Sequence, residues 1–187
     1  MLQPSDRRIE DLSFADLERL AELMYEEGNF QAAATYMQHA VKLPQADSST
    51  HFNLGQALFG VEQYEAAAYA FSGAIPKIAD AYVNRGLSWE MIGDTGAARR
   101  DYRSALSINI RDVDALVNIA TLDLMEERVC SAEIFLRWAA LIDPRCNWQL
   151  SDVFIHYGDL DQAAKLLEIA VAAGEERAAT SLTELRA

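Results

Sequence analysis

Small residues recur through this chain at fixed intervals, and that recurrence restricts its fold more than any other feature. Three columns of small residues all advance in steps of 34, 31, 34 and 31 residues. The columns are Ala21, Gly55, Gly86, Ala120 and Ser151; Ala33, Ala67, Ala98, Ala132 and Ala163; and Ala40, Ala74, Ala105, Ala139 and Ala170. Fifteen small residues in one repeating pattern predict five structural repeats.

Each predicted repeat consists of two helices. In the second repeat, apolar and small residues follow helical spacing over residues 49–60 and 64–75. Small side chains let two such helices cross closely, whereas a larger side chain would force their axes apart. No segment alternates with the period of a strand, so we expect an all-α chain. The turns inside the repeats are expected at Gly28-Asn29, Glu62-Gln63, Gly93-Asp94, Glu127-Arg128 and Gly158-Asp159.

Composition excludes several classes of protein. The 187 residues include 16 basic and 29 acidic side chains, which gives a net charge of −13 at pH 7. An apolar content of 51% excludes a disordered chain, and the acidity argues against nucleic acid as a partner. No stretch approaches the ~20 apolar residues of a membrane-spanning helix. Residues 1–8 lack the apolar segment of a secretory signal, so we expect no membrane insertion and a cytoplasmic location.

The residue types that carry chemistry are scattered. The three histidines lie in different predicted repeats, and Cys130 and Cys146 have no histidine or acidic partner at helical spacing. Residues 93–96 are too few for a phosphate-binding loop and lack its lysine. We therefore expect no catalytic residue, no metal site and no cofactor, and a chain that is not an enzyme.

The repeat pattern resembles that of the tetratricopeptide repeat (TPR). The second repeat carries His51, Leu54-Gly55, Leu58, Ala67, Phe71 and Pro76 at the positions of the family pattern. The resemblance covers about residues 14–174 and implies a right-handed α-solenoid of helix-turn-helix hairpins. Asp123 stands where the family prefers tyrosine, from which we expect looser packing in the fourth hairpin.

The repeats divide the chain into consecutive segments. A lead segment over 1–13 is followed by five TPR-like repeats over 14–174, with the boundaries 14–47, 48–78, 79–112, 113–143 and 144–174. Residues 175–187 are interpreted as a C-terminal capping helix with Ala178, Leu182 and Leu185 on its apolar face. A frayed polar tail is the alternative for this segment.

The resemblance further implies that the first helix of each repeat lines a concave groove. Three asparagines, Asn53, Asn84 and Asn118, occupy one column there, and they either hold the backbone of an extended peptide or bond within the fold. The groove is expected to be acidic in the first repeats and apolar in the last. The candidate partner-binding residues are Glu18, Glu22, Tyr25, Phe52, Asn53, Gln56, Phe59, Asn84, Leu87, Glu90, Met91, Asn118, Thr121, Leu124, Met125, Trp148 and Gln149.

A second candidate surface lies on the convex face that the resemblance implies. Ile134 and Trp138 are one helical turn apart in outward-facing columns of the fourth repeat. An exposed apolar pair would indicate a contact site, including one for self-association. In the alternative interpretation both side chains pack against the fifth hairpin.

These observations predict a protein–protein interaction module, a scaffold or adaptor that binds an extended, neutral-to-basic partner segment carrying an apolar anchor. The alternatives are a secretion-type or assembly chaperone and a non-catalytic regulatory subunit of an enzyme complex. Related grooves that bind acidic tails need basic side chains where this chain has acidic ones, at Glu18, Glu22, Asp80 and Asp114.

Overall fold

The computed structural model describes residues 8–186, which form eleven α-helices and no strand. The all-α prediction is therefore confirmed for this part of the chain. The expectations for residues 1–7, which include the absence of a signal sequence and the start of the lead segment, lie outside the described residues. None of the helices within residues 8–186 is long and apolar enough to cross a membrane.

The chain divides into two compact units, residues 1–101 and 102–187, and the division falls within α6. The helices up to this division are the 3-10 helix η2 (Ile9–Asp11), α1 (Phe14–Glu26), α2 (Phe30–Ala40), α3 (Ser48–Gly60), α4 (Tyr64–Ala74), α5 (Asp80–Met91) and α6 (Thr95–Ile108). Those that follow are α7 (Val113–Met125), α8 (Val129–Ile142), the 3-10 helix η3 (Pro144–Cys146), α9 (Asn147–His156), α10 (Leu160–Ala172) and α11 (Glu176–Leu185).

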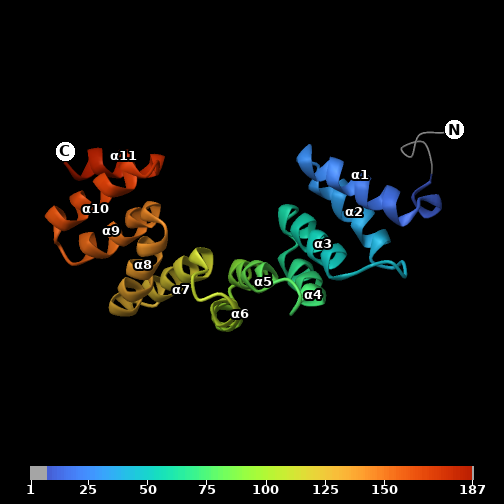
Figure 1. Cartoon of the computed structure of the whole chain (residues 1–187), viewed down its shortest axis with the longest axis horizontal. Coiled ribbons are helices and arrows are strands. Elements are labelled where there is room, and N and C mark those ends of the chain that lie inside the picture. Colours follow the sequence, from blue (N-terminus) through green and yellow to red (C-terminus); the bar gives the residue numbers. More distant parts are fainter. Residues whose placement is uncertain (1–7, 187) are drawn as a thin grey trace. The chain divides into compact units, whose positions relative to one another are not determined.

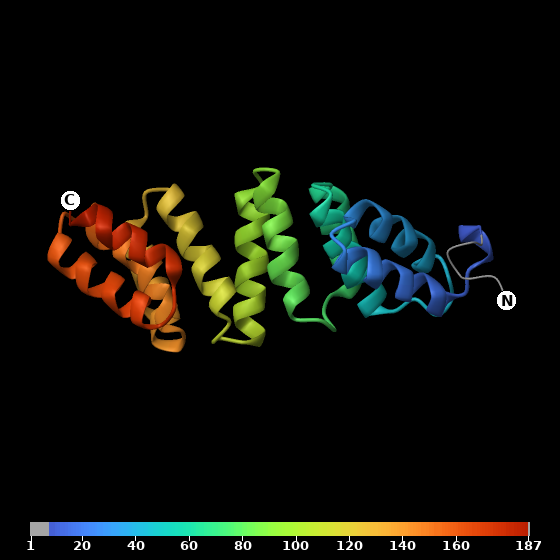
Figure 2. The same ribbon diagram turned by 90° about the horizontal axis from the view of Figure 1, so that it is seen from above.

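Consecutive helices pack as antiparallel pairs. In the first unit α1 packs along α2 and α3 along α4, and in the second unit α7 packs along α8 and α9 along α10 (Figures 1 and 2). Within the first unit α2 also contacts α3, and α4 contacts α5, so each hairpin packs on the next. The repeat boundaries stay a prediction, and each predicted repeat contains two α-helices.

The turns inside the hairpins share one backbone conformation. Glu62 and Glu127 have φ angles of 62° and 58°, and the glycines at the equivalent positions of the other three hairpins, 28, 93 and 158, have φ angles of 74–85°. Only glycine adopts this left-handed region without strain. Glu62 and Glu127 therefore hold a conformation that costs free energy in two of the five turns.

The small-residue columns lie where the helices cross. All fifteen residues of these columns are buried. A Cβ atom added at Gly55 would lie 2.6 Å from the ring of Phe71, so α3 and α4 approach each other too closely for a side chain at that point. At this crossing the structure confirms our inference that a small residue lets the two helices approach closely.

The hydrophobic core of the first unit runs through its hairpins. It includes Leu17 and Leu20 of α1, Met37 of α2, Leu58 of α3 and Phe71 of α4, all buried. Burying such side chains contributes about 1.5–3 kcal/mol each relative to leaving them in water. Hairpin packing, rather than any single contact, therefore stabilises this unit.

The expectation of looser packing around Asp123 is wrong. Asp123 is 1% exposed, and its neighbours Leu116, Ile119 and Leu122 on α7 are fully buried. The carboxylate accepts hydrogen bonds from Nη2 of Arg128, at 2.6 Å, and from the hydroxyl of Ser131. A buried carboxylate is tolerated when it is paired and hydrogen-bonded, and these partners supply both conditions.

The last helix caps the second unit. α11 packs on α10, and Ala178 of α11 forms a buried cluster with Leu167 and Ala170 of α10. Leu182 and Leu185 pack at the edge of this cluster. The prediction of a C-terminal capping helix is confirmed, and residues 176–185 are not a frayed tail.

Candidate partner-binding site

A cavity of about 460 Å³ opens in the first unit among α1, α2 and α3. Five of the residues predicted to bind a partner line it, namely Glu18, Glu22, Tyr25, Asn53 and Gln56. They come from α1 and α3, the first helices of the first two predicted repeats. The structure thus brings five of the seven predicted residues of these two helices together around one space, which has the size of ordinary ligand pockets.

The wall contributed by α1 is acidic. Glu18, Glu22 and Glu26 follow one another at intervals of four residues, which places them on one face of the helix. The described residues that line the cavity include these three carboxylates and no lysine or arginine. Arg19, the nearest basic residue in sequence, instead forms an ion pair with Asp16 at 3.7 Å. The cavity therefore presents uncompensated negative charge.

The start of α3 fixes one end of this wall. The hydroxyl of Thr50 lies 3.4 Å from Oδ1 of Asp47 and 3.5 Å from Oε1 of Glu18, so its one proton is shared between these two carboxylates. Thr50 is fully buried, and its backbone N–H donates to the carboxylate of Asp47, the N-cap of α3. This backbone bond is the main cause that lowers the pKa of Asp47. The cap thus places the Thr50 hydroxyl within reach of both the Asp47 and the Glu18 carboxylates.

Aromatic rings determine the geometry at the other end. Tyr25 of α1 makes an edge-to-face contact with Phe30, the first residue of α2, at a centroid distance of 5.0 Å. A Cβ atom added at Gly60 would lie 2.5 Å from the Phe30 ring, so the end of α3 closes directly on this ring. These contacts hold Tyr25 at the edge of the cavity.

The floor of the cavity was not predicted from the sequence. It is formed by buried Ala21, Ala33, Met37 and Ala57. The repeat pattern assigns two of these alanines to helix crossings and Met37 to a core position. The sequence nevertheless marks Met37 as different, because the equivalent positions in the next two repeats hold the aromatic residues Phe71 and Tyr102. A flexible thioether in place of a ring gives a floor that adapts to a ligand.

The asparagine column differs from one repeat to the next. Asn53 is exposed at the cavity, and neither its amide nor that of Gln56 bonds to another described side chain or backbone group. Nδ2 of Asn84 donates to the carbonyl of Asp80 in its own helix at 2.9 Å, which leaves one N–H and Oδ1 for a ligand. Asn118 is half-buried on α7. Of the two column asparagines in the first unit, Asn53 and Asn84, only Asn53 lines the cavity.

The remaining predicted residues of the first unit lie outside the cavity. Phe52 packs against Phe71, and Phe59 against Tyr64, at centroid distances of 5.6 and 5.1 Å. On α5, Leu87 and Glu90 are half-buried, whereas Met91 is exposed. The two phenylalanines therefore stabilise the α3–α4 hairpin.

In the second unit the predicted partner-binding residues make different kinds of contact. On α7, Met125 is exposed, Leu124 is half-buried and the hydroxyl of Thr121 donates to the carbonyl of Val117. On α9, Trp148 donates from Nε1 to the hydroxyl of Ser181 at 3.2 Å, and α11 covers its ring. Oε1 of Gln149 is buried without a hydrogen-bond partner among residues 8–186.

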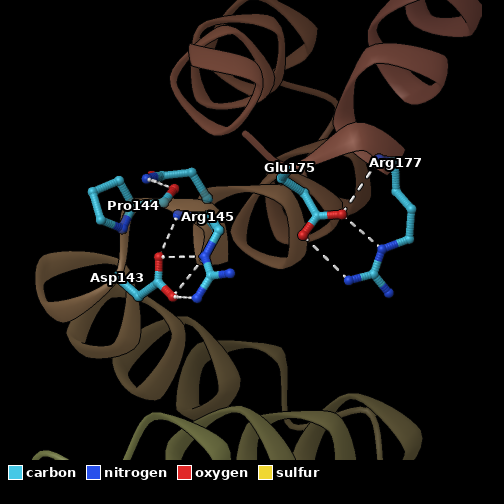
Figure 3. A network of polar contacts seen from close by, with 6 residues as sticks. Asp143, Pro144, Arg145, Glu175 and Arg177 are labelled. Carbon is cyan, nitrogen blue, oxygen red and sulfur yellow. Dashed lines mark hydrogen bonds and ion pairs between the residues drawn. The ribbon is translucent and has the colours of Figure 1, made fainter. Parts of the chain in front are cut away.

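Arginine side chains near α9 are engaged by carboxylates. Arg145 forms an ion pair with Asp143, and Arg177 forms one with Glu175, at 2.6 and 2.7 Å (Figure 3). The hydrogen bonds from Arg145 lower the pKa of Asp143, and those from Arg177 lower the pKa of Glu175. Arg145 is therefore already neutralised by its neighbour.

The second candidate surface lies on α8. Ile134 is 66% exposed, Trp138 is 36% exposed and Leu141, one turn further, is 84% exposed. Their spacing places the three side chains on one stripe of the helix. Ile134 and Leu141 are not buried against the fifth hairpin. No group of three or more histidine, cysteine or acidic side chains within residues 8–186 has the arrangement of a metal site.

The helices of this chain form helix-turn-helix pairs, and this arrangement matches solved structures of TPR proteins. The solved structure of MamA superposes on this chain with a TM-score of 0.73, at 18% identity, over 88% of this chain and 93% of MamA. TTC0263, a TPR protein of Thermus thermophilus, gives a TM-score of 0.70 at 16% identity, over 92% of this chain and 98% of its own. The predicted TPR-type fold is confirmed.

A third similar structure is that of YrrB, described as a TPR protein with an unusual peptide-binding site. Its TM-score is 0.66 at 14% identity, over 92% of each chain. No protein-family model matches this chain, and no curated protein matches it in sequence.

Proposed function

We propose that this protein is an interaction module that binds an extended segment of a partner protein at the cavity among α1, α2 and α3. The observation that carries this proposal is the cavity itself, which combines uncompensated carboxylates, two unbonded amides and an apolar floor. Such a combination of apolar surface with a few convergent polar groups is typical of binding sites. The description of YrrB as having a peptide-binding site supports a peptide ligand by analogy.

The charge of the cavity selects the kind of segment. Three carboxylates on one helix face attract lysine or arginine side chains and repel acidic segments. Because the carboxylates are close to solvent, dissolved salt screens this attraction. A neutral-to-basic segment whose binding weakens with salt fits this site.

The amides supply contacts that do not depend on the partner's sequence. Asn53 and Gln56 each carry two N–H donors and one carbonyl acceptor, so they can bond to the backbone of an extended peptide. In the second unit, taken by itself, we propose Met125 and Leu124 as contacts for an apolar side chain of a partner, since α11 already engages Trp148. The chaperone and regulatory-subunit alternatives use the same site and differ in the identity of the partner.

Site-specific photocrosslinking tests this function. A benzoylphenylalanine at position 53 faces the cavity, and one at position 38, on the exposed side of α2, serves as the matched control. We expect position 53 to capture a partner in the native cell and position 38 not to. Gln56→Trp, which fills the cavity mouth, should abolish the capture without changing the melting temperature. Equal capture at both positions would contradict the proposal.

A further inference from the structure

Three arginines of the described chain are each held by the same combination of side chains, a carboxylate together with an aromatic ring. Arg177 bonds to Glu175 and lies over the ring of Trp148, 4.2 Å from its centroid. Arg137 bonds to Glu133 and lies over Phe154 at 5.3 Å. A guanidinium ion suits such a place because it is planar, weakly hydrated and able to stack while it donates hydrogen bonds.

The same combination occurs in the first unit. Arg85 bonds to Asp101 and lies over the ring of Tyr82 at 5.8 Å. Three arginines of the described chain thus occupy a place made by a carboxylate and a ring. The cavity among α1, α2 and α3 presents Glu22, Glu26 and the ring of Tyr25, and no arginine or lysine among residues 8–186 lines it.

We propose that the cavity binds one arginine side chain of the partner segment. This inference rests on the proposed function and names the residue type that the partner must carry. The aliphatic stem packs on Met37 and Ala57 of the floor, and the guanidinium reaches the carboxylates of α1. Its five N–H donors can bridge carboxylates on successive turns, which the compact ammonium group of lysine does less well.

The three carboxylates also repel one another while the cavity is empty of cations. Like charges at intervals of four residues on a helix are mutually destabilising. Glu18 has a weak contact with the Thr50 hydroxyl, whereas Glu22 and Glu26 make no ion pair or hydrogen bond through their side chains to other described residues. A bound guanidinium removes this repulsion, so the charge of α1 favours occupancy. The cavity, with its ring and apolar floor, distinguishes arginine from other cations.

The test uses three synthetic eleven-residue peptides of glycine, serine and alanine that differ only at the central residue. That residue is arginine, lysine or citrulline, the neutral analogue of arginine. Isotope-labelled full-length protein is titrated with each peptide at low salt and followed by nuclear magnetic resonance. We expect the arginine peptide to shift the backbone signals of residues 18–26 and 53–57 in a saturable way. Lysine should bind roughly threefold or more weakly, because it gains less from the ring, and citrulline should not bind.

Variants separate charge from the ring. Tyr25→Leu should reduce the preference for arginine over lysine to about one, whereas Glu22→Gln with Glu26→Gln should weaken both peptides by roughly tenfold. Glu27→Gln, next in sequence but outside the lining, is the control and should change neither affinity.

Several outcomes would overturn the inference. These are equal binding of the arginine and lysine peptides to the wild type, no binding of any peptide, or shifts confined to other helices. If photocrosslinking at position 53 captures a segment without arginine, this inference fails and the proposed function stands. If position 53 captures nothing beyond the control, the proposed function itself fails.

Discussion

Arg85 and Asp101 form a doubly hydrogen-bonded ion pair between α5 and α6 in the first unit. Nε and Nη2 of Arg85 lie 2.7 and 2.6 Å from the two carboxylate oxygens of Asp101, which is 5% exposed. Nη1 of the same guanidinium donates to the hydroxyl of Ser72 on α4 at 2.9 Å. The hydrogen bonds to Asp101 raise the pKa of Arg85. One side chain therefore joins three consecutive helices.

Removing only one member of this pair should be costly. Asp101→Ala leaves a largely buried guanidinium without its carboxylate, and we expect the free energy of unfolding to fall by about 2–3 kcal/mol. The double variant Arg85→Met with Asp101→Leu should recover most of this loss, since no uncompensated charge is left. Urea denaturation of the single and double variants measures both effects. A double variant less stable than Asp101→Ala would show that the pair itself, and not the stranded charge, sets the stability.

Substitutions in the turn at Glu62-Gln63 should make the protein more stable. Glu62 has a φ angle of 62°, and Gln63 makes no capping hydrogen bond to α4. At the equivalent turn Gly93 has a φ angle of 85°, and Asp94 accepts a hydrogen bond from the N–H of Ala97 at 2.8 Å. Glu62→Gly with Gln63→Asp should raise the free energy of unfolding by about 1–2 kcal/mol, through relief of strain and a new cap.

The reverse exchange is the control for this prediction. Gly93→Glu with Asp94→Gln should destabilise the protein by a similar amount, because it introduces the strain and removes the cap. Both variants are compared with the wild type by thermal denaturation. Shifts of the same sign in the two variants would contradict the explanation.

The two cysteines should react at very different rates. Cys130 is exposed, whereas Cys146 is buried and burial raises its pKa to about 11, with a further contribution from the charge of Asp143. Because the thiolate is the nucleophile, Cys146 at pH 8 is reactive in only about one molecule in a thousand. Ellman's reagent should titrate one thiol per native chain and two per chain in guanidinium chloride. Two fast thiols in the native protein would show that Cys146 is accessible.

The exposed stripe on α8 predicts self-association at high protein concentration. Ile134, Trp138 and Leu141 form an apolar surface next to solvent, and such surfaces mark contact sites. Salt should strengthen the association, since it screens the repulsion between chains of net charge −13. Sedimentation velocity of the wild type and Trp138→Ala at high salt measures this effect, and Trp138→Ala should sediment as the smaller species. If both proteins are monomers, this face does not join two copies.

The sequence by itself determined the hairpins, the helix crossings and the cap. The expected helices at 49–60 and 64–75 correspond to Ser48–Gly60 and Tyr64–Ala74, and every residue of the small columns is buried. These features follow from interactions between residues that are close in sequence, because a helix face, a turn and a hairpin crossing all have short periods. The repeat pattern in the sequence therefore predicts the hairpins, the helix crossings and the cap directly.

Only the tertiary structure decided what the polar and aromatic side chains do. The sequence does not distinguish Asn53 from Asn84, yet one faces a cavity and the other bonds to its own helix at Asp80. Trp148 lies in a groove column, but it is covered by α11, whose Ser181 lies 33 residues further along the chain. Whether two groups form a hydrogen bond or leave a cavity between them depends on differences of a few tenths of an ångström in the distance between their helices. Periodicity determines which face of a helix turns inward, whereas the packing of separate helices determines which atoms meet there.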